Sequence, residues 1–416
     1  MASFEIKGGN RLEGEVSISG GKNAALPLIA ACLLTREQVV IKNCPRIRDV
    51  EAMIEIMRAL GAEAELEGNT LAICAEGLRT VVMPRELSGR IRSSIFMLGA
   101  MAARMKAAEF FHPGGCKIGK RPIDVHLCAL KQLGATICEK EGRIICRAEQ
   151  LHGAVIHLAC ASVGATENAM MAATLADGIT IIENAAREPE IRELQDFLVS
   201  MGGKISGGGT GQIIVQGVRQ LHGTEWSCMQ DRIEAGTYMV AAAAAKGDVF
   251  LRYTDWEAVR TVGEVLLQSG ARVRLYPEGI RVQCSRRLRR FDIATACYPG
   301  FPTDMQAQMC ALAAGACGTS IIHENIFESR FSHALELRKM GADIRLYGRF
   351  IRVKGVERLR GAQVTATDLR GGAALVIGGL TAEGTTQIAE IEKIERGYER
   401  LEEKMAALGG QIRRTD

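Results

Sequence analysis

The sequence has few histidines and no long apolar run. Only 7 of its 416 residues are histidine, and none lies in the HExxH spacing of a zinc hydrolase. The longest apolar stretches, such as residues 24–34 and 239–245, are shorter than the ~18 residues that a membrane-spanning helix needs. Charge enters by Glu5 and Lys7, so the N-terminus lacks the apolar core of a signal peptide. We therefore expect a soluble, cytoplasmic protein with no metal site and no membrane partner.

Other absences exclude further classes of protein. Lysine and arginine total 52 against 48 aspartates and glutamates, a net charge of +4 that lacks the concentrated positive stripe needed to bind nucleic acid. The sequence contains neither a complete P-loop, GxxxxGK(S/T), nor a strand-linked GxGxxG, which argues against nucleotide hydrolysis and dinucleotide cofactors. Its 13 cysteines form no CxxC pair, so we expect reduced and mostly buried thiols rather than disulfides or a zinc site.

A repeat fills the chain. A helix-period segment that ends in glycine and continues as an alternating strand occurs six times, with the glycines at Gly61, Gly134, Gly202, Gly270, Gly341 and Gly409. Successive glycines are 73, 68, 68, 71 and 68 residues apart, and a sixth of the chain is about 69 residues. A glycine just beyond a helix end favours a left-handed cap, so each repeat is predicted to end in a helix and a hairpin.

Each repeat also has an Ala-rich helix, apolar on nearly all sides, followed by a strand. Such a helix is predicted to be buried, whereas the second helix of each repeat is amphipathic and covers the outside. Each repeat therefore reads strand, helix, strand, helix and hairpin. Three repeats make one domain, in which strand-bearing faces surround three buried helices, and the fold class is α/β with two such domains.

The two ends of the chain are predicted to belong to one domain. The sixth repeat lacks the return strand of its hairpin, and residues 4–14 match residues 351–361 in hydrophobic and glycine spacing. We therefore predict a first domain at 22–229 and a second at 1–21 plus 230–416. The chain then crosses between them twice, which predicts a hinge with the active site in the cleft between the domains.

Polar side chains recur at the starts of the buried helices. Four are residue types that cap helices: Ser162, Asp231, Thr303 and Asp368. Three are cations, which oppose the helix macrodipole: Lys22, Arg92 and Arg370. Arginine also recurs before the outer helices, at Arg121, Arg187, Arg330 and Arg396. Since an arginine fork binds phosphate or carboxylate through two bonds, these positions predict a ligand with several negative groups. Gly371 and Gly372 are expected to loosen the helix start after Arg370.

Cys116 differs from the other cysteines in its surroundings. It follows Pro113-Gly114-Gly115, in a loop too rich in glycine for a packed element. Three cations lie within five residues of it: Lys117, Lys120 and Arg121. Because nearby cations lower the pKa of a thiol, we predict a reactive thiolate or a tuned proton donor here. His112 and His126 flank the loop, so a cysteine–histidine hydrolase dyad stays open as a weaker alternative.

Six motifs are spread from one end of the chain to the other: KNAA from Lys22, PGGCKIGKRPIDVH around Cys116, SVGATEN from Ser162, ENAAREPEI from Glu183, FPTDMQAQ from Phe301 and RGYER from Arg396. Together they closely resemble the UDP-N-acetylglucosamine enolpyruvyl transferase family. The resemblance implies two inverse α/β barrel domains, each of three repeated units. It also implies transfer of the enolpyruvyl group of phosphoenolpyruvate to the 3-hydroxyl of UDP-N-acetylglucosamine with release of phosphate, the first committed step of peptidoglycan precursor synthesis.

The resemblance assigns roles to individual residues. It makes Cys116 the proton donor, able to bond covalently to phosphoenolpyruvate, and Asp304 the group that takes the proton of the sugar hydroxyl or anchors that hydroxyl. The implied phosphoenolpyruvate ligands are Lys22, Asn23, Arg121, Arg330, Arg370 and Arg396. The implied ligands of the nucleotide sugar are Asn23, Arg92, Arg121, Pro122, Ile123, Asp124, Val125, Ser162, Val163, Gly164, Asp304 and Ile326. No metal, cofactor or obligate protein partner is implied, because arginines and helix dipoles stabilise the charge.

The sequence departs from the family pattern at two places. Lys117 and Lys120 stand where small or neutral residues are expected, and Cys160-Ala161 stands where Lys-Val is common, on the uridine side. Two other functions stay open. A shikimate-3-phosphate enolpyruvyl transferase would share the chemistry but leave the PGGC loop unexplained. A catalytically inactive nucleotide-sugar-binding homologue would have no need to keep Cys116 and Asp304.

Overall fold

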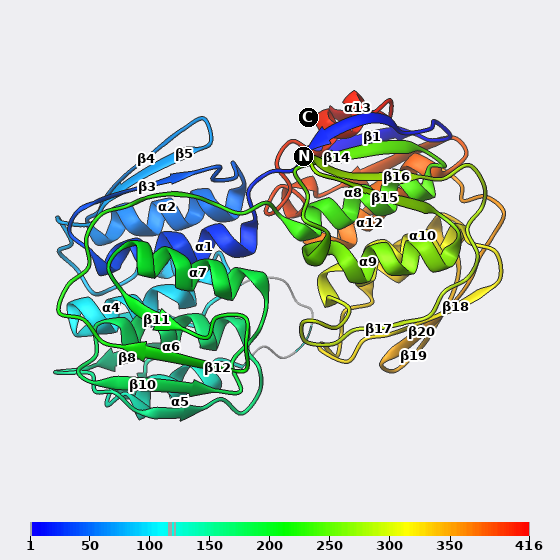
Figure 1. Cartoon of the computed structure of the whole chain (residues 1–416). Helices are drawn as coiled ribbons and strands as arrows, with labels where there is room; N and C mark the ends of the chain where they lie inside the picture. Colours follow the sequence, from blue (N-terminus) through cyan, green and yellow to red (C-terminus); the bar gives the residue numbers. More distant parts are fainter. Residues whose placement is uncertain (1, 115–118, 120–121, 416) are drawn as a thin grey trace. The chain divides into compact units, whose positions relative to one another are not determined.

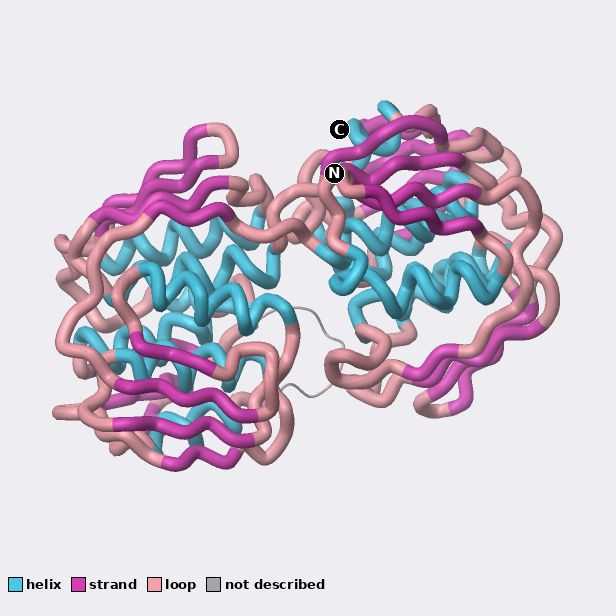
Figure 2. The backbone as a smooth tube through the Cα atoms, in the orientation of Figure 1, coloured by secondary structure: helices cyan, strands magenta, loops and turns pink. Residues whose placement is uncertain are grey.

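The computed structural model describes residues 2–114, 119 and 122–415. The residues singled out around the PGGC loop lie outside this part of the chain: Cys116, Lys117, Lys120 and Arg121. The described chain forms two compact units, which we call the N domain (20–114 and 122–229) and the C domain (2–19 and 230–415). In each of them, small sheets lie around a group of helices (Figure 1 and Figure 2).

The N domain contains three repeats of helix, strand, helix and hairpin. The first comprises α1 (Lys22–Ala31), η1 (Cys32–Leu34), β3 (Gln38–Lys42), α2 (Arg48–Leu60), β4 (Glu63–Glu67) and β5 (Thr70–Cys74). The second comprises α3 (Arg85–Ser88), η2 (Arg92–Phe96), α4 (Met97–Met105), β6 (Ala107–Phe111), α5 (Asp124–Gln132), β7 (Thr136–Lys140) and β8 (Arg143–Arg147). The third comprises β9 (Val155–His157), α6 (Val163–Thr174), β10 (Ile179–Glu183), α7 (Pro189–Ser200), β11 (Lys204–Ser206) and β12 (Gln212–Gln216).

The C domain repeats the same order three times. The fourth repeat of the chain begins with β13 (Glu225–Ser227), which still lies in the N domain. It continues in the C domain with α8 (Arg232–Ala244), β14 (Asp248–Arg252), α9 (Trp256–Ser269), β15 (Arg272–Tyr276) and β16 (Gly279–Gln283). The fifth comprises β17 (Ile293–Ala294), η3 (Thr303–Met305), α10 (Gln306–Gly315), β18 (Thr319–His323), α11 (Ser332–Lys339), β19 (Asp343–Tyr347) and β20 (Phe350–Lys354). The sixth comprises β21 (Gln363–Thr365), α12 (Leu369–Thr381), β22 (Thr385–Ala389), η4 (Ile391–Lys393), α13 (Leu401–Ala407) and β23 (Gln411–Thr415). The predicted α/β fold of two domains with repeated units is confirmed.

Each repeat builds one small sheet with a constant order. In the fifth repeat the order is β17-β18-β20-β19, with β17 parallel to β18 and the hairpin antiparallel to it. The third repeat has the equivalent order, β9-β10-β12-β11. In the second repeat the first strand is reduced to a parallel bridge between Val82 and Glu109.

Strands distant in sequence complete three of the sheets. β1 (Ser3–Lys7) pairs antiparallel with both β22 and β23, so it supplies the return strand that the sixth repeat lacks, as the sequence predicts. β2 (Glu13–Ser17) lies parallel to β14 in the C domain, and β13 lies parallel to β3 in the N domain. The strand that precedes each crossing of the chain therefore belongs to the domain that the chain is about to leave.

The helices follow the predicted division into buried and amphipathic. All residues of α1 from Ala24 to Ala31 are buried, whereas α2 buries Val50, Met53 and Met57 and exposes its acidic face. A fully buried leucine such as Leu28 contributes about 1.5–3 kcal/mol to folding. Among the described residues, no helix is long and apolar enough to cross a membrane.

The six repeat glycines have the backbone conformation that the sequence predicts. Their φ angles are all positive, between 88° and 106°. A side chain at φ near 100° is strained, so glycine ends the second helix of each repeat and turns the chain into the hairpin.

The cysteines only partly match the prediction of buried thiols. Of the twelve in the described part, six are buried and five are exposed: Cys128, Cys138, Cys160, Cys297 and Cys317. The prediction of buried thiols is therefore wrong for these five, because Cys160, Cys297 and Cys317 lie in loops and Cys128 and Cys138 lie on exposed faces of α5 and β7. Burial raises the pKa of Cys146 to about 11, which makes that thiol unreactive at neutral pH.

Candidate active site

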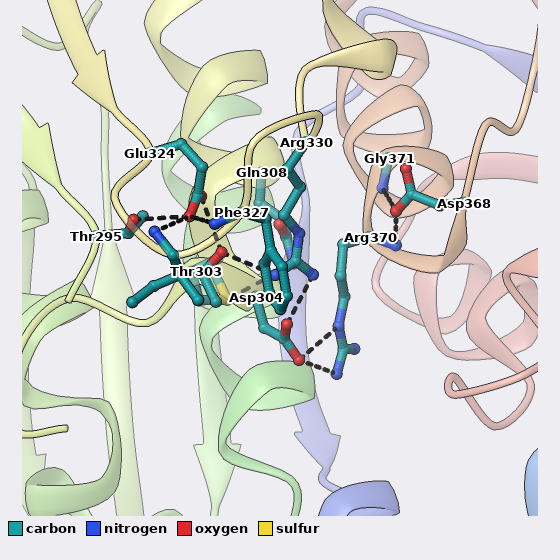
Figure 3. A network of polar contacts seen from close by, with 12 residues as sticks. Thr295, Thr303, Asp304, Gln308, Glu324, Phe327, Arg330, Asp368, Arg370 and Gly371 are labelled. Atoms are coloured by element: carbon teal, nitrogen blue, oxygen red, sulfur yellow. Dashed lines mark hydrogen bonds and ion pairs between the residues drawn. The ribbon is translucent and has the colours of Figure 1, made fainter. Parts of the chain in front are cut away.

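Three of the predicted site residues meet in the C domain, in what we call the Asp304 cluster: Asp304, Arg330 and Arg370. Asp304 lies in η3, at the start of α10, and its Oδ1 accepts from Arg330 Nη2 at 2.7 Å. Its Oδ2 accepts from Arg370 Nη2 at 3.1 Å and from Nε at 3.3 Å. Figure 3 shows the carboxylate between the two guanidinium groups. The repeat brings these residues together because each lies at or just before a helix start.

The two arginines of this cluster strongly favour the ionised form of Asp304. The side chains of Arg330 and Arg370 are only 6% and 3% exposed, and that of Asp304 is 27% exposed. Burial raises the pKa of Asp304, but the ion pairs with the two arginines outweigh burial and hold this pKa well below its ordinary value. Asp304 is therefore an anion and a weak base in this state.

A buried glutamate positions the loop that carries Arg330. The carboxylate of Glu324, which is fully buried, accepts from the Thr295 and Thr303 hydroxyls at 2.9 and 2.8 Å, and from the N–H of Ile326 at 2.9 Å. The Thr303 hydroxyl in turn accepts from Arg330 Nη1 at 2.8 Å. Sequence reasoning missed Glu324; the signal was a Glu-Asn pair at the end of the second strand in two repeats, at Glu183, the last residue of β10, and at Glu324, just after β18.

This network overturns the prediction that Thr303 caps a helix. The residue before η3 is Pro302, and the Thr303 side chain makes no capping bond. The other three predicted caps are confirmed: Ser162 accepts from the N–H of Ala165, and Asp231 and Asp368 each accept from two N–H groups of their helices. Thr303 differs because Glu324 and Arg330 lie within reach of its hydroxyl.

The start of α12 holds Arg370 firmly. The guanidinium lies over the ring of Tyr398, 5.3 Å from its centroid, and the Tyr398 hydroxyl bonds to Thr237 at 2.9 Å and to Gln308 at 3.2 Å. Arg370 Nη1 is buried and has no hydrogen-bond partner among the described residues. This Nη1 group can therefore donate to an oxygen of a bound anion.

The two glycines after Arg370 lie in close contact with the residues around this helix start, and the prediction that they loosen it stays a prediction. A Cβ at Gly371 would lie 2.5 Å from Thr367 Oγ1, and one at Gly372 would lie 2.4 Å from Ile394 Cγ1. Only glycine allows this close approach of α12 to its neighbours.

Two further predicted residues of the C domain lie close to these elements. The N–H of Ile326 is held by Glu324, as described above. Arg396 is partly exposed and lies between η4 and α13, two residues before Tyr398.

In the N domain, the structure gives Lys22 an internal partner. Its Nζ lies 2.6 Å from Asp49 Oδ2, and both side chains are largely buried, at 13% and 4% exposure. The cation at this helix start is therefore balanced by an anion of the chain itself, where the sequence predicted only a bound ligand. Asn23, the next residue, is half-buried at the first turn of α1.

Eight of the predicted nucleotide-sugar ligands come from three segments of the N domain that pack together. Arg92 Nη2 donates to the carbonyl of Pro122 at 3.3 Å, which joins η2 to the segment Pro122–Val125 at the start of α5. A Cβ at Gly164 would lie 2.8 Å from His126 and 3.1 Å from Phe96, so the start of α6 packs closely on both. Ser162, Val163 and Gly164 are half-buried there, and Asp124 is exposed.

Asn168 holds these segments together and was missed in the sequence. Its Nδ2 donates to the carbonyl of Ile95 at 3.0 Å and lies 2.9 Å from His126 Nδ1, while its Oδ1 accepts from the N–H of Gly99 at 2.7 Å. Asn168 is fully buried. A polar residue inside an otherwise apolar helix, as in SVGATEN, was the signal that could have found it.

Comparisons with known proteins identify the family of the chain. Residues 6–405 match the family described as EPSP synthase (3-phosphoshikimate 1-carboxyvinyltransferase). The chain is 47% identical to UDP-N-acetylglucosamine 1-carboxyvinyltransferase 2 of Caldanaerobacter subterraneus, over 99% of both chains. It is 49% identical to UDP-N-acetylglucosamine 1-carboxyvinyltransferase 1 of Carboxydothermus hydrogenoformans, over 100% of this chain and 99% of the relative.

Solved structures share the fold over the whole chain. The enolpyruvyl transferase NikO from Streptomyces tendae superposes with a TM-score of 0.89 at 26% identity, covering 100% of this chain and 99% of that one. EPSP synthase from Acinetobacter baumannii has a TM-score of 0.76 at 20% identity, with complete coverage of both chains, and shows the fold alone. Identity near one half over the full length, with the family match, shows that the chain belongs to the UDP-N-acetylglucosamine 1-carboxyvinyltransferase family of enolpyruvyl transferases.

Proposed function

We propose that this protein transfers the enolpyruvyl group of phosphoenolpyruvate to the 3-hydroxyl of UDP-N-acetylglucosamine and releases phosphate. The observation that carries the proposal is the Asp304 cluster, an anion between two buried arginines, in a chain nearly half identical from end to end to enzymes of that name. We also infer a cytoplasmic location, because the 13 cysteines form no CxxC pair and no small-domain framework, which is typical of reduced thiols.

The addition step needs two proton transfers, and the elimination step needs one. In the addition step, the methylene carbon of phosphoenolpyruvate gains a proton, and the sugar oxygen bonds to C2 and loses its proton. In the elimination step, the methyl group loses a proton, the double bond re-forms and the C2–phosphate bond breaks. We assign the proton transfer at the methylene carbon to Cys116, by resemblance to the family. Asp304 is the group proposed to bind the sugar hydroxyl.

The arginines of the cluster suit the negative charges of phosphoenolpyruvate. Arg330 and Arg370 are rigidly held, and a planar guanidinium binds carboxylate or phosphate oxygens through two parallel bonds. The buried Nη1 of Arg370, which has no partner in the described part of the chain, is a donor for such an oxygen. Preorganised cations of this kind stabilise the charge that develops on the leaving phosphate. Lys22, Asn23, Arg121 and Arg396 complete the proposed set.

The pKa of Asp304 gives this residue a defined part in the sequence of events. While both arginines pair with it, Asp304 is too weak a base to accept a proton from an alcohol. When the anionic groups of phosphoenolpyruvate take up donors of Arg330 and Arg370, the pull on the carboxylate falls and its pKa rises. Asp304 then anchors the hydroxyl and accepts its proton as the C–O bond forms.

The N domain supplies the proposed binding surface for the nucleotide sugar. The start of α6 offers N–H groups and the positive end of its helix dipole to the diphosphate. Arg92 and the segment Pro122–Val125 lie against it through the contacts of Asn168 and His126.

Measurement of released phosphate tests the proposal. The protein is incubated with phosphoenolpyruvate and either UDP-N-acetylglucosamine or shikimate-3-phosphate. We expect release only with UDP-N-acetylglucosamine, and loss of release in Cys116→Ser. Release only with shikimate-3-phosphate would assign the protein to the sister activity. Binding of UDP-N-acetylglucosamine without release of phosphate would make the protein an inactive homologue.

A further inference from the structure

The chain passes from one domain to the other at two equivalent points. The segments EVSISGGKN from Glu15 and EWSCMQDRI from Glu225 occupy equivalent places in the first and fourth repeats, so Ser19 corresponds to Met229. In the C domain, the N–H of Asp231 donates to the carbonyl of Ser19 at 2.9 Å. In the N domain, the N–H of Gly21 donates to the carbonyl of Met229 at 2.7 Å. The two crossing segments are thus bonded to each other on both sides.

A buried carboxylate of the C domain holds the first crossing. Glu234 Oε2, in the first turn of α8, accepts from the N–H of Ser19 at 2.8 Å. Lys404 of α13 donates to Glu234 Oε1 and to the Ser19 hydroxyl, both at 2.6 Å. The Glu234 side chain is 2% exposed and that of Lys404 is 18% exposed. Burial raises the pKa of Glu234, but the Lys404 cation opposes this effect.

A buried carboxylate of the N domain holds the second crossing at the equivalent atom. Glu193 Oε1, on α7, accepts from the N–H of Met229 at 2.7 Å and from the indole N–H of Trp226 at 3.2 Å. Glu193 is 8% exposed, and its Oε2 has no hydrogen-bond partner among the described residues. Trp226 packs edge-on against Phe197, with ring centroids 5.9 Å apart.

We propose that Glu193 and Glu234 are positioning residues for the transfer reaction. Each lies inside its own domain and holds the peptide group at which the chain leaves that domain. We call each of these carboxylates an anchor. The two carboxylates lie at positions that are not equivalent in the repeats, but the N–H groups that they bind are equivalent. Close packing alone would not require both of these hydrogen bonds. A buried carboxylate is costly, and a residue whose only task was to fill space would be apolar. The inference rests on the proposed function, because positioning is measured through the reaction.

The two anchors differ in one physical respect, which makes the proposal testable. Glu234 has a cation beside it, whereas the ionised groups that act on Glu193 are the acids Glu190 and Asp196 of its own helix. Burial, only partly offset by the bonds from Met229 and Trp226, raises the pKa of Glu193 to about 7. A carboxylate accepts more strongly than the neutral acid, so this anchor weakens as the pH falls through about 7.

Among the described residues, the groups that act on Glu193 include no cation. The elements of the described chain that pack against α7 include α1, α6 and β11. They also include β13, whose Trp226 packs on Phe197 and whose Glu225 pairs with Lys42. Lys22 of α1 pairs with Asp49, and Lys204 of β11 is exposed. Glu167 of α6 is fully buried, and burial together with Glu190 and Glu188 raises its pKa well above the ordinary value.

Trp226 offers a direct readout, because the chain has 2 tryptophans. In Trp256→Phe, Trp226 is the sole tryptophan and reports the charge on the carboxylate that its indole N–H binds. We expect its emission to change with a midpoint near pH 7, to lose this transition when Glu193→Gln is added, and to keep it when Asp196→Asn is added as the matched control on the same helix. A transition unaffected by Glu193→Gln, or none at all, would overturn the anchor at Glu193.

Kinetics then separate positioning from mere folding. Glu193→Ala should lower kcat by about tenfold, the change that a loss of one charge-assisted hydrogen bond produces, and Glu193→Gln should restore most of it because the amide oxygen still accepts from Met229. The pH profile of Glu193→Gln should lack the inflection near pH 7. Unchanged kcat in a folded Glu193→Ala protein would overturn the proposal. The fluorescence experiment needs no turnover, so failure of the transferase assay in the unmodified protein is distinguishable from failure of the anchor.

Discussion

Replacing Asp304 by Asn should destabilise the C domain and leave the N domain unchanged. The substitution keeps the shape of the side chain but leaves two buried guanidinium groups without their carboxylate, since Arg330 and Arg370 are only 6% and 3% exposed. Breaking a buried ion pair costs about 3–5 kcal/mol. The lower end applies here, because Asp304 itself is 27% exposed and water reaches it.

The expected shift is large enough to measure by calorimetry. A loss of about 3 kcal/mol in a domain of roughly 200 residues lowers its Tm by about 6–12 °C. The matched control is Glu383→Gln, which removes a carboxylate from a pair with Arg358 in the same domain, where both side chains are 67% exposed. That change should cost less than about 1 kcal/mol, because exposed pairs contribute little.

Inorganic phosphate should show whether a bound anion can replace the carboxylate of Asp304 between the two arginines. Phosphate should raise the Tm of Asp304→Asn more than that of the unmodified protein, since the anion replaces the missing carboxylate beside Arg330 and Arg370.

The pH dependence of stability gives a second check. The pKa of Asp304 is depressed in the folded state, so the contribution of this carboxylate to the free energy of unfolding is present above the unfolded pKa and is lost as the pH falls through the lower folded pKa. The difference between the two proteins should therefore stay constant from about pH 5 to 8. An equal Tm for both proteins, with or without phosphate, would refute the reasoning.

Three further predictions follow from particular contacts. Lys404→Met should lower the free energy of unfolding by about 3–5 kcal/mol in chemical denaturation, because it leaves Glu234 buried and unpaired, and adding Glu234→Gln should recover part of the loss; no recovery would contradict this. Gly372→Ala should cost about 1–3 kcal/mol, since its Cβ would lie 2.4 Å from Ile394 Cγ1, and an unchanged Tm would mean that the helix start is loose after all. An epoxide phosphonate such as fosfomycin should alkylate Cys116 alone, faster with UDP-N-acetylglucosamine present, and intact-mass analysis of Cys116→Ser should show no adduct; labelling spread over several cysteines would count against a tuned thiol.

Much of the fold was readable because it repeats. A glycine at each of six equivalent positions specifies a left-handed helix end, and all six have positive φ. The missing strand of the sixth repeat could be found for the same reason, since the segment at the N-terminus carries the pattern of the return strand. What the repeat could not predict is where an individual polar side chain points. Thr303 is of a type that caps helices, but it bonds to Glu324 and Arg330 because a loop distant in sequence lies beside it.

The cations at the helix starts were predictable, but their partners were not. Lys22 pairs with Asp49 from another helix, and Arg370 pairs with Asp304, 66 residues away in the chain. The sequence shows that such cations need anions, because a buried cation without one is costly. Which carboxylate pairs with each cation depends on how the helices pack, within one repeat for Lys22 and between repeats for Arg370, and one sequence does not record that packing.

These internal pairs have a consequence for the proposed chemistry. Without a substrate, Asp304 is the anion that keeps Arg330 and Arg370 tolerable in a buried setting, and the same pairing makes Asp304 a poor base. Phosphoenolpyruvate carries a phosphate and a carboxylate that compete for these guanidinium groups. When it succeeds, the arginines keep an anion, the carboxylate of Asp304 is released, and its pKa rises in the direction that accepting a proton requires. In the proposed mechanism, proton acceptance at Asp304 is thereby tied to the presence of phosphoenolpyruvate, and the sugar hydroxyl is activated only when its reaction partner is bound.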